Sequence, residues 1–444
     1  MTTQQLLDRA YGLASNNVLR RATTSRLIYA LQPAAVNFSQ HLPSEDSPHE
    51  RIPAHVSGVN AITIDKFEGR YLLSGGADSS IAIWDLEAQT CATSAGETYL
   101  PLSAVNKTAE EHKLGITQLC FYPFDSLAFL TSSYDHTVKL YSSETLAPSA
   151  SFDLDAVVYN IALSPIASHL LVACATQSPN VRLIDLRSGA STHSLAGHTG
   201  AILSTAWSPT RDHLLASGAS DGSVRIWDIR RSISELGTLD LENSIGGTRT
   251  SSRTALAHKG PVNGITWTDD AAHIVTCGHD QRIRVWNAES RANTLANFGP
   301  AIRNNGLAPR IPVLPPASFL HPGADILYYP NGTEILAYEL FDAKLLRRLR
   351  RPAPAPSHAQ STGLDRARDR VTALAWRAHD VELYSAHADG SIGAWKPRTE
   401  EDAMADAEEE GEREQREEGR KRKRGVLDEI YRGFTGGRVT FGGL

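Results

Sequence analysis

One set of residues recurs along this chain of 444 residues and restricts the folds open to it. In each copy a Ser or Thr lies four residues before an Asp, an aromatic residue lies six after it, and a His lies 22 or 23 before it. Four copies are complete, and the second has Tyr141 as its aromatic residue. The three with Trp are His55, Ser74, Asp78 and Trp84; His198, Ser217, Asp221 and Trp227; and His258, Thr276, Asp280 and Trp286. Such self-similarity indicates one structural unit that is repeated in space.

Weaker copies complete the series. A fifth copy keeps Ser385, Asp389 and Trp395 but lacks the upstream His, and two degraded copies end near Ile184 and Tyr338. The aromatic or Ile markers then define seven units, 43 to 59 residues apart. Alternating apolar stretches within the units are suited to short strands. Seven units of about four strands predict an all-β fold, a seven-bladed β-propeller with WD repeats.

The recurring residues predict a structural network rather than a catalytic site. The Asp of each copy sits in a tight turn, where poor solvation makes it depend on hydrogen-bond donors. The His, the Ser or Thr and the Trp indole N–H can supply them and lock neighbouring strands together. A nucleophile occurs once in a protein, on a strained turn, whereas this set recurs. We therefore expect no catalytic residue, no metal, no cofactor and no enzymatic activity.

The net charge of −6 is unevenly distributed along the chain. Residues 400–418 hold eleven Asp or Glu against two Arg, and residues 420–424 add five positive charges. The remainder is close to neutral, which argues against a general basic field for nucleic acid. No apolar run is long enough to span a membrane, and no secretory leader is visible. The four cysteines form no CxxC pair, a pattern typical of reduced intracellular thiols.

Both ends of the chain lie outside the repeat. Residues 4–31 have apolar positions spaced as two short amphipathic helices, with a break at Gly12–Asn17. These helices can form either a cap packed on the same propeller or an element that docks into a groove of a partner. The basic run at 420–424 predicts a nuclear-localisation patch and a nuclear protein. The predicted domains are a helix–loop–helix at 1–35, the propeller at 36–397 and a charged tail at 398–444.

One repeat unit carries a more specific pattern. Leu215–Arg230 reads LASGASDGSVRIWDIR, and Ile184–Arg187 is a partial second copy of its end. This unit resembles the box of the WD-repeat substrate receptors of cullin-4 ubiquitin ligases. Over about residues 5–397 the chain resembles the Cockayne syndrome group A family. The matching segments include Leu19–Ala22, Glu68–Gly76, Phe121–Pro123, Ala206–Pro209, Ala257–Gly264, Asn293–Gly299 and Glu382–Ser385.

The resemblance implies a specific function. That family serves as the non-catalytic substrate receptor of a cullin-4 RING ubiquitin ligase in transcription-coupled nucleotide excision repair. The implied partners are the three-propeller adaptor of the ligase, the Cockayne syndrome group B translocase and the RNA polymerase II complex. The N-terminal helices and the rim at the end of the box would bind the adaptor. The residues expected there are Leu6, Leu13, Leu19, Arg20, Arg21, Arg26, Asp228, Arg230 and Arg231.

The opposite rim of the propeller is expected to bind the target. In each unit the residue after the turn Asp points to that rim, and one lysine comes from a neighbouring loop. The candidates are His136, Lys259, Gln281 and Arg282.

Two other functions stay open. A direct binder of damaged DNA or other nucleic acid would need a basic face with an apolar wedge. The basic cluster at 347–351 could serve such a face, although the alternative is a solvated strand end. The other possibility is an unrelated WD-repeat scaffold in RNA processing or signalling.

Overall fold

The computed structural model describes most of the chain. Leu6, Leu13 and the predicted tail beyond Arg398, with its nuclear-localisation patch, lie outside the described residues. The chain forms two compact units, Met1–Lys396 and Pro397–Leu444. Among the described helices, none is both long and apolar enough to cross a membrane. The described residues are 7, 10–12, 15–40, 53–88, 91–93, 96–105, 111–166, 169–231, 234–243, 255–352, 369–377 and 379–398.

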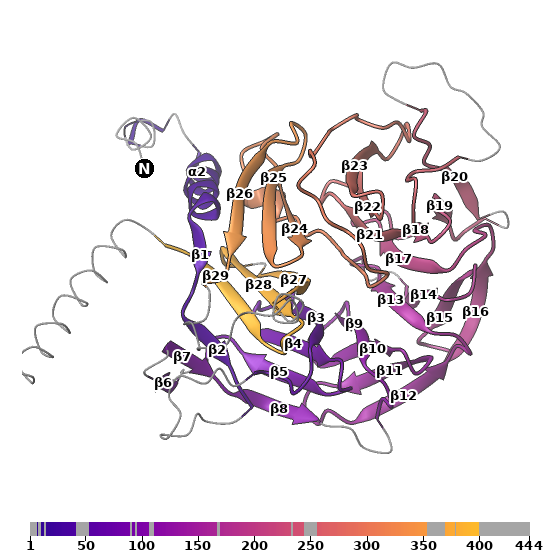
Figure 1. Ribbon diagram of the computed structural model, residues 1–444, viewed down its shortest axis with the longest axis horizontal. Helices are drawn as coiled ribbons and strands as arrows, with labels where there is room; N and C mark the ends of the chain where they lie inside the picture. The colour runs from indigo at the N-terminus through magenta and orange to yellow at the C-terminus, as the bar shows by residue number, and fades with distance from the viewer. Residues whose placement is uncertain are drawn as a thin grey trace, which may run out of the picture. The chain divides into compact units, whose positions relative to one another are not determined.

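Seven antiparallel blades follow one another around a centre (Figure 1), which confirms the predicted seven-bladed β-propeller. The first two are β3 (Val59–Ile64), β4 (Tyr71–Gly76), β5 (Ile81–Asp85) and β8 (Pro101–Val105); then β9 (Ile116–Phe121), β10 (Ala128–Ser133), β11 (Thr137–Ser142) and β12 (Pro148–Asp153). The next two are β13 (Val158–Leu163), β14 (Leu171–Thr176), β15 (Val181–Asp185) and β16 (Ala190–Leu195); then β17 (Ile202–Trp207), β18 (Leu214–Ala219), β19 (Val224–Asp228) and β20 (Glu235–Thr238).

The last three blades are less regular. They comprise β21 (Val262–Trp267), β22 (His273–Gly278) and β23 (Arg282–Asn287); β24 (Ile326–Asn331), β25 (Glu334–Glu339) and β26 (Leu345–Arg350); and β27 (Val371–Arg377), β28 (Glu382–His387) and β29 (Ile392–Pro397). A bridge from Trp286 to Asn293 replaces the outer strand of the fifth blade. A bridge from Val313 to Tyr328 marks the inner edge of the sixth.

The hydrophobic core lies between neighbouring blades. Val224 and Ile226 of the fourth blade pack with Val262 and Ile265 of the fifth, and all four side chains are buried. Strand direction alternates within each blade, so the first and third strands end at one face, here called the lower face. The turns between the second and third strands lie at the opposite, upper face. Each repeat Asp is therefore placed at the upper face.

The ring is closed by a strand from the N-terminal segment. Strand β1 (Leu31–Pro33) pairs with β29 and becomes the outer strand of the seventh blade, and the Ala34 N–H donates to the Ala394 carbonyl at 2.9 Å. Leu31 is 1% exposed and packs with Leu383 and Trp395. Pairing an edge strand in this way removes an open edge from the sheet. The segment predicted as the helix–loop–helix, 1–35, thus contributes a strand to the propeller.

A small additional sheet lies beside the first blade. Strand β2 (Val36–Phe38) runs parallel to β7 (Gly96–Tyr99), which pairs antiparallel with β6 (Cys91–Thr93). The Phe38 ring stacks on Tyr99 at 5.2 Å and meets Trp84 edge-on at 5.3 Å. These contacts connect the segment after β1 to the core between the first and seventh blades.

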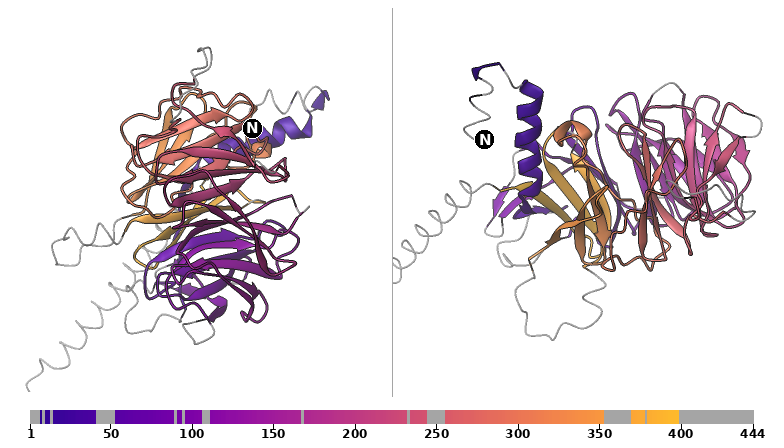
Figure 2. Two further views of the ribbon diagram at one scale, coloured as in Figure 1. Left: turned by 90° about the vertical axis from the view of Figure 1, so that its right-hand side faces the viewer. Right: turned by 90° about the horizontal axis from the view of Figure 1, so that it is seen from above.

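One helix, α2 (Asn16–Tyr29), leads into β1 and packs at the outer edge of the sixth blade (Figures 1 and 2). Its Ile28 is 2% exposed and packs with Phe319 at the end of the short 3-10 helix η1 (Ala317–Phe319). Thr24 Oγ1 donates to the Phe319 carbonyl at 2.6 Å. The first of the two predicted helices falls mostly outside the described residues. Gly12, at the predicted break, has a φ of +69°, a conformation that interrupts a helix.

Candidate functional site

A buried hydrogen-bond network recurs in the three blades whose complete repeats carry Trp, whereas in the second blade the buried Tyr141 hydroxyl has no hydrogen-bond partner among the described residues. In the first blade Ser74 Oγ accepts the indole N–H of Trp84 at 2.8 Å and lies 2.7 Å from His55 Nε2. The same two contacts recur among Trp227, Ser217 and His198 (2.7 and 2.7 Å) and among Trp286, Thr276 and His258 (2.9 and 2.8 Å). All of these side chains are buried. In each of these three blades the Ser or Thr hydroxyl is hydrogen-bonded to both the Trp and the His. These residues therefore hold the strands together, and the hydroxyl is not free to act as a nucleophile.

The turn Asp completes each network at the upper face. Asp280 Oδ1 lies 2.9 Å from His258 Nδ1, whereas Asp221 reaches His198 partly through the Ser223 hydroxyl. Burial lowers the pKa of His198 and of His258, which favours neutral imidazoles. Burial alone would raise the pKa of Asp280, but its hydrogen bond with His258 and the positive charge of Arg284 hold that pKa well below its usual range.

Because these histidines are buried and neutral, we expect stability to fall on mild acidification. Burial lowers the pKa of His55 from 6.5 to about 4, although Asp78 acts in the opposite direction. The unfolded chain then binds the proton more readily than the folded one. The contribution of His55 to the free energy of unfolding is fully present above about pH 6.5 and is lost as the pH falls toward 4. At pH 5 the loss is about 2 kcal/mol.

Urea unfolding at pH 7.5 and pH 5 tests this expectation. His55→Gln should reduce the difference between the two unfolding free energies by about 2 kcal/mol. The exposed His321→Gln is the matched control. If His55→Gln and wild type lose the same free energy between the two pH values, His55 does not carry the effect.

The fifth copy contains a His that the sequence pattern missed. Ser385 Oγ accepts the Trp395 indole N–H at 2.9 Å and lies 2.9 Å from His387 Nε2. His387 comes from the same strand as Ser385, two residues on, and not from an upstream loop. Its spacing differs from the other copies, so a search for a His 22 or 23 residues before the Asp could not find it.

At the lower face, the predicted rim residues cluster at the end of β19. Arg230 Nε and Nη2 donate to the two carboxylate oxygens of Asp228, both at 3.0 Å, and Arg231 Nε lies 3.5 Å from Asp228. The hydrogen bond from Arg230 lowers the pKa of Asp228 to about 2. The side chains of Arg230 and Arg231 are 62% and 64% exposed. Exposed guanidinium groups in this position can bind a carboxylate of another protein.

Four predicted contact residues lie on helix α2, and they differ in burial. Leu19 is 4% exposed, so it is a packing residue in this structure. Arg20 is exposed with its guanidinium 5.7 Å from the centre of the Phe319 ring, Arg21 is half-buried and Arg26 is exposed. Because β1 is the fourth strand of its blade, it begins at the lower face, and α2 ends there.

Three apolar side chains before and at the start of α2 are exposed. Tyr11 is 75% exposed, Val18 is 53% exposed and Leu7 is 45% exposed. Their spacing of four and seven residues is the signal that could have singled them out. Exposed large apolar residues gathered in one segment are typical of a protein-binding element.

The four target candidates lie at the upper face and are exposed: His136, Lys259, Gln281 and Arg282. His136 and Gln281 directly follow the turn Asp and have φ values of +72° and +57°. Gln281 and Arg282 also contact their own blade region, where Arg282 Nη1 donates to Asn297 Oδ1 at 2.9 Å. These residues are well separated from the Asp228 rim, because the two groups occupy opposite faces.

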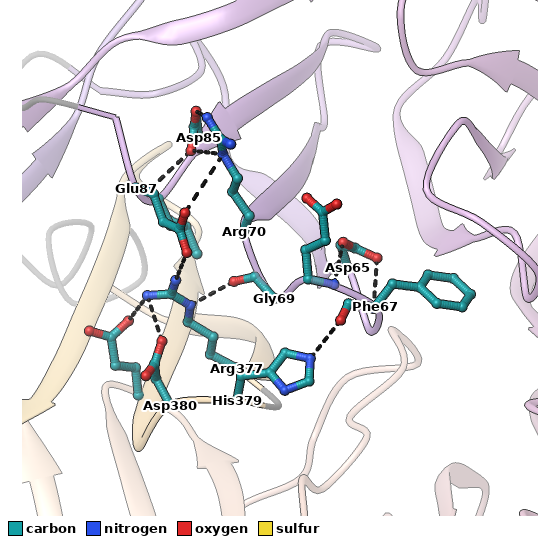
Figure 3. Close-up of polar contacts among 12 residues, drawn as sticks. Asp65, Phe67, Gly69, Arg70, Asp85, Glu87, Arg377, His379 and Asp380 are labelled. Atoms are coloured by element: carbon teal, nitrogen blue, oxygen red, sulfur yellow. Dashed lines mark hydrogen bonds and ion pairs between the residues drawn. The ribbon is translucent and has the colours of Figure 1, made fainter.

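A polar cluster joins the first and seventh blades at the lower face (Figure 3). Arg377, 7% exposed, donates from Nε to the Gly69 carbonyl at 2.6 Å. Its other nitrogens lie 3.0 Å from Glu382, 3.1 Å from Asp380 and 3.3 Å from Glu87. No sequence pattern marks this cluster, because Arg377 lies 308 residues from Gly69 and 290 from Glu87 along the chain.

The repeats match a known family. WD40, described as WD domain, G-beta repeat, matches residues 47–85, 104–142, 189–228 and 249–287. These segments end with the third strands of the first, second, fourth and fifth blades, where the complete copies end. The chain is a WD-repeat β-propeller.

The chain is also similar to individual proteins over segments that lie outside the matched WD40 repeats. The propeller chain is similar to the WD repeat-containing protein ATCSA-1 of Arabidopsis thaliana, 28% identical over 476 aligned residues that cover 91% of this chain and 97% of that protein. This similarity confirms the resemblance predicted from the sequence. The chain is also similar to the ribosome biogenesis protein ytm1 of Emericella nidulans, 28% identical over 54% of this chain and 55% of that protein. The ytm1 of Aspergillus clavatus is 26% identical over 62% and 63%.

Proposed function

We propose that this propeller is the non-catalytic substrate receptor of a nuclear cullin-4 RING ubiquitin ligase in transcription-coupled nucleotide excision repair. The observation that carries the proposal is the similarity to ATCSA-1, which extends over nearly the whole of both chains. The partners are the three-propeller adaptor of the ligase, the Cockayne syndrome group B translocase and the RNA polymerase II complex. The receptor raises the effective concentration of target lysines near the ligase and performs no chemistry.

In this proposal the adaptor binds the lower face. The exposed guanidinium groups of Arg230 and Arg231 supply positive charge there, and the exposed side chains of Tyr11 and Val18 supply apolar area near α2. Apolar anchors together with arginines at the rim are common in protein interfaces. The upper face, with His136, Lys259, Gln281 and Arg282, is left for the target.

Binding to the purified adaptor tests the proposal. We expect the full chain to co-elute with the adaptor on size exclusion, and Arg231→Glu to weaken the complex several-fold, because it places a negative charge opposite the expected carboxylate. Arg231 is the better position for charge reversal. Arg230 makes two hydrogen bonds to the buried Asp228, so a Glu there would also disturb folding.

Arg282→Glu is the matched control, because Arg282 is also an exposed arginine but lies on the upper face. Its complex with the adaptor should be as stable as that of wild type. Equal weakening by both variants would show a general charge effect. Absence of co-elution for the full chain would refute the adaptor assignment.

A scaffold in ribosome biogenesis is the second candidate, favoured by the similarity to ytm1. That similarity covers about half of each chain, whereas the one to ATCSA-1 covers nearly all. Failure to bind the adaptor, together with sedimentation with pre-ribosomal particles, would favour this candidate.

Direct nucleic-acid binding, which the basic cluster at 347–351 suggests, has less support than the two candidates above. Arg348 and Arg350 pair with Glu334, and Arg347 donates to the Tyr29 carbonyl at 2.9 Å. These three arginines therefore already have ion-pair or hydrogen-bond partners within the chain. A DNA affinity that falls steeply with salt would nevertheless support direct binding.

A further inference from the structure

A cavity of about 130 Å³ opens at the centre of the ring. The first strands of three successive blades, β27, β3 and β9, lie next to one another there (Figure 1). Arg370 directly precedes β27, and Tyr134 lies in the turn after β10, so the cavity opens toward the upper face. The segment 308–311 completes the lining.

Two arginines line this cavity. Arg310 is 9% exposed, and its Nη1 donates to the Pro330 carbonyl at 2.8 Å, which uses one of its five N–H donors. Burial lowers the pKa of Arg310, and the positive charge of Arg370 acts in the same direction. Within the described part of the chain, no carboxylate forms an ion pair with Arg310. A buried cation without a counter-charge is unfavourable, and an anion in the cavity would compensate it.

Neutral polar groups complete the site. Gln118 and Tyr134 line the same cavity and can contribute amide and hydroxyl donors. Burial raises the pKa of Tyr134, so its hydroxyl keeps the proton that it would donate. Asp369, the sequence neighbour of Arg370, is not among the lining residues. The cavity is thus small, positively charged and supplied with donors.

We propose that this cavity binds a phosphate group, either as a free anion or as a phosphorylated side chain of a partner segment. A phosphate has three strong acceptor oxygens and a charge near −2, which suits two guanidinium groups and neutral donors. The cavity and the two arginines belong to the propeller itself. Phosphate binding there does not depend on binding of the adaptor, which is proposed for the opposite face.

Calorimetric titration of the full chain with inorganic phosphate and with a capped phosphoserine tests the site at constant chloride. Wild type should show saturable binding of at least one of them, weakened about tenfold in Arg370→Gln. Arg370 is exposed, so this variant is expected to fold normally, which its melting temperature without phosphate will check. Lys113→Gln is the matched control, because Lys113 is an exposed cation beside the turn Asp135 at the upper face and lies outside the cavity.

The outcomes distinguish the two sources of phosphate. Tighter binding of phosphoserine supports a phosphorylated partner, and tighter or equal binding of inorganic phosphate supports the free anion. The proposal is overturned if neither probe saturates, or if Arg370→Gln binds both probes as wild type does. Weakening by Lys113→Gln to the same degree would also overturn it, because the effect would then be a general property of the face.

Discussion

Deleting residues 1–33 is expected to unfold the propeller or lower its melting temperature sharply, whereas deleting residues 1–29 should leave it folded. The two variants differ by four residues, which contain strand β1. Loss of β1 exposes the edge of β29 and removes the buried Leu31. Burial of one such side chain contributes about 1.5–3 kcal/mol, and each lost ladder hydrogen bond about 1 kcal/mol. Against a total stability of about 5–15 kcal/mol, this loss is large.

Circular dichroism during heating provides the measurement. The 1–29 deletion removes the packing of Ile28 on Phe319, so a moderate decrease in melting temperature is expected from it alone. We expect this shorter deletion to remain β-rich and to lose the adaptor complex. If both deletions melt at the same temperature, β1 does not close the ring in solution.

Replacing Arg377 by Ala is expected to destabilise the folded state by about 3–5 kcal/mol, because it breaks a buried ion-pair network. Burial alone raises the pKa of Glu382, but Lys396, the Tyr384 hydroxyl and Arg377 together bring it below its usual range. Without Arg377, the mostly buried Glu382 loses one of these partners, and the Gly69 carbonyl loses its donor. Urea unfolding at pH 7.5 measures the change.

Arg348→Ala is the matched control for this prediction. Arg348 also pairs with a carboxylate, but its side chain is 44% exposed, and Glu334 keeps a second partner in Arg350 at 2.8 Å. Exposed pairs contribute about 0–1 kcal/mol. Equal destabilisation by Arg377→Ala and Arg348→Ala would contradict the view that Arg377 holds the first and seventh blades together.

Local spacing in the sequence predicts contacts between adjacent strands, but it does not predict which surface covers a helix. Because Ser74 and Trp84 lie ten residues apart on adjacent strands, local spacing was enough to foresee their contact. Leu19 was expected at a partner interface, yet it is buried. An amphipathic pattern identifies the apolar side of a helix but does not say which surface covers it.

The sequence by itself determined the repeat, the number of blades and the residues of the network in the three blades whose complete copies carry Trp. These follow from local periodicity, since every strand and turn is specified by neighbours within about 40 residues. Only the tertiary structure decided that β1 closes the ring, that Arg377 reaches Gly69 and that Arg310 and Arg370 share one cavity. Closure of the ring brings together residues as far apart as Thr372 and Val59, which are hydrogen-bonded across 313 positions. No local pattern encodes such a contact, because it exists only once all seven blades have packed.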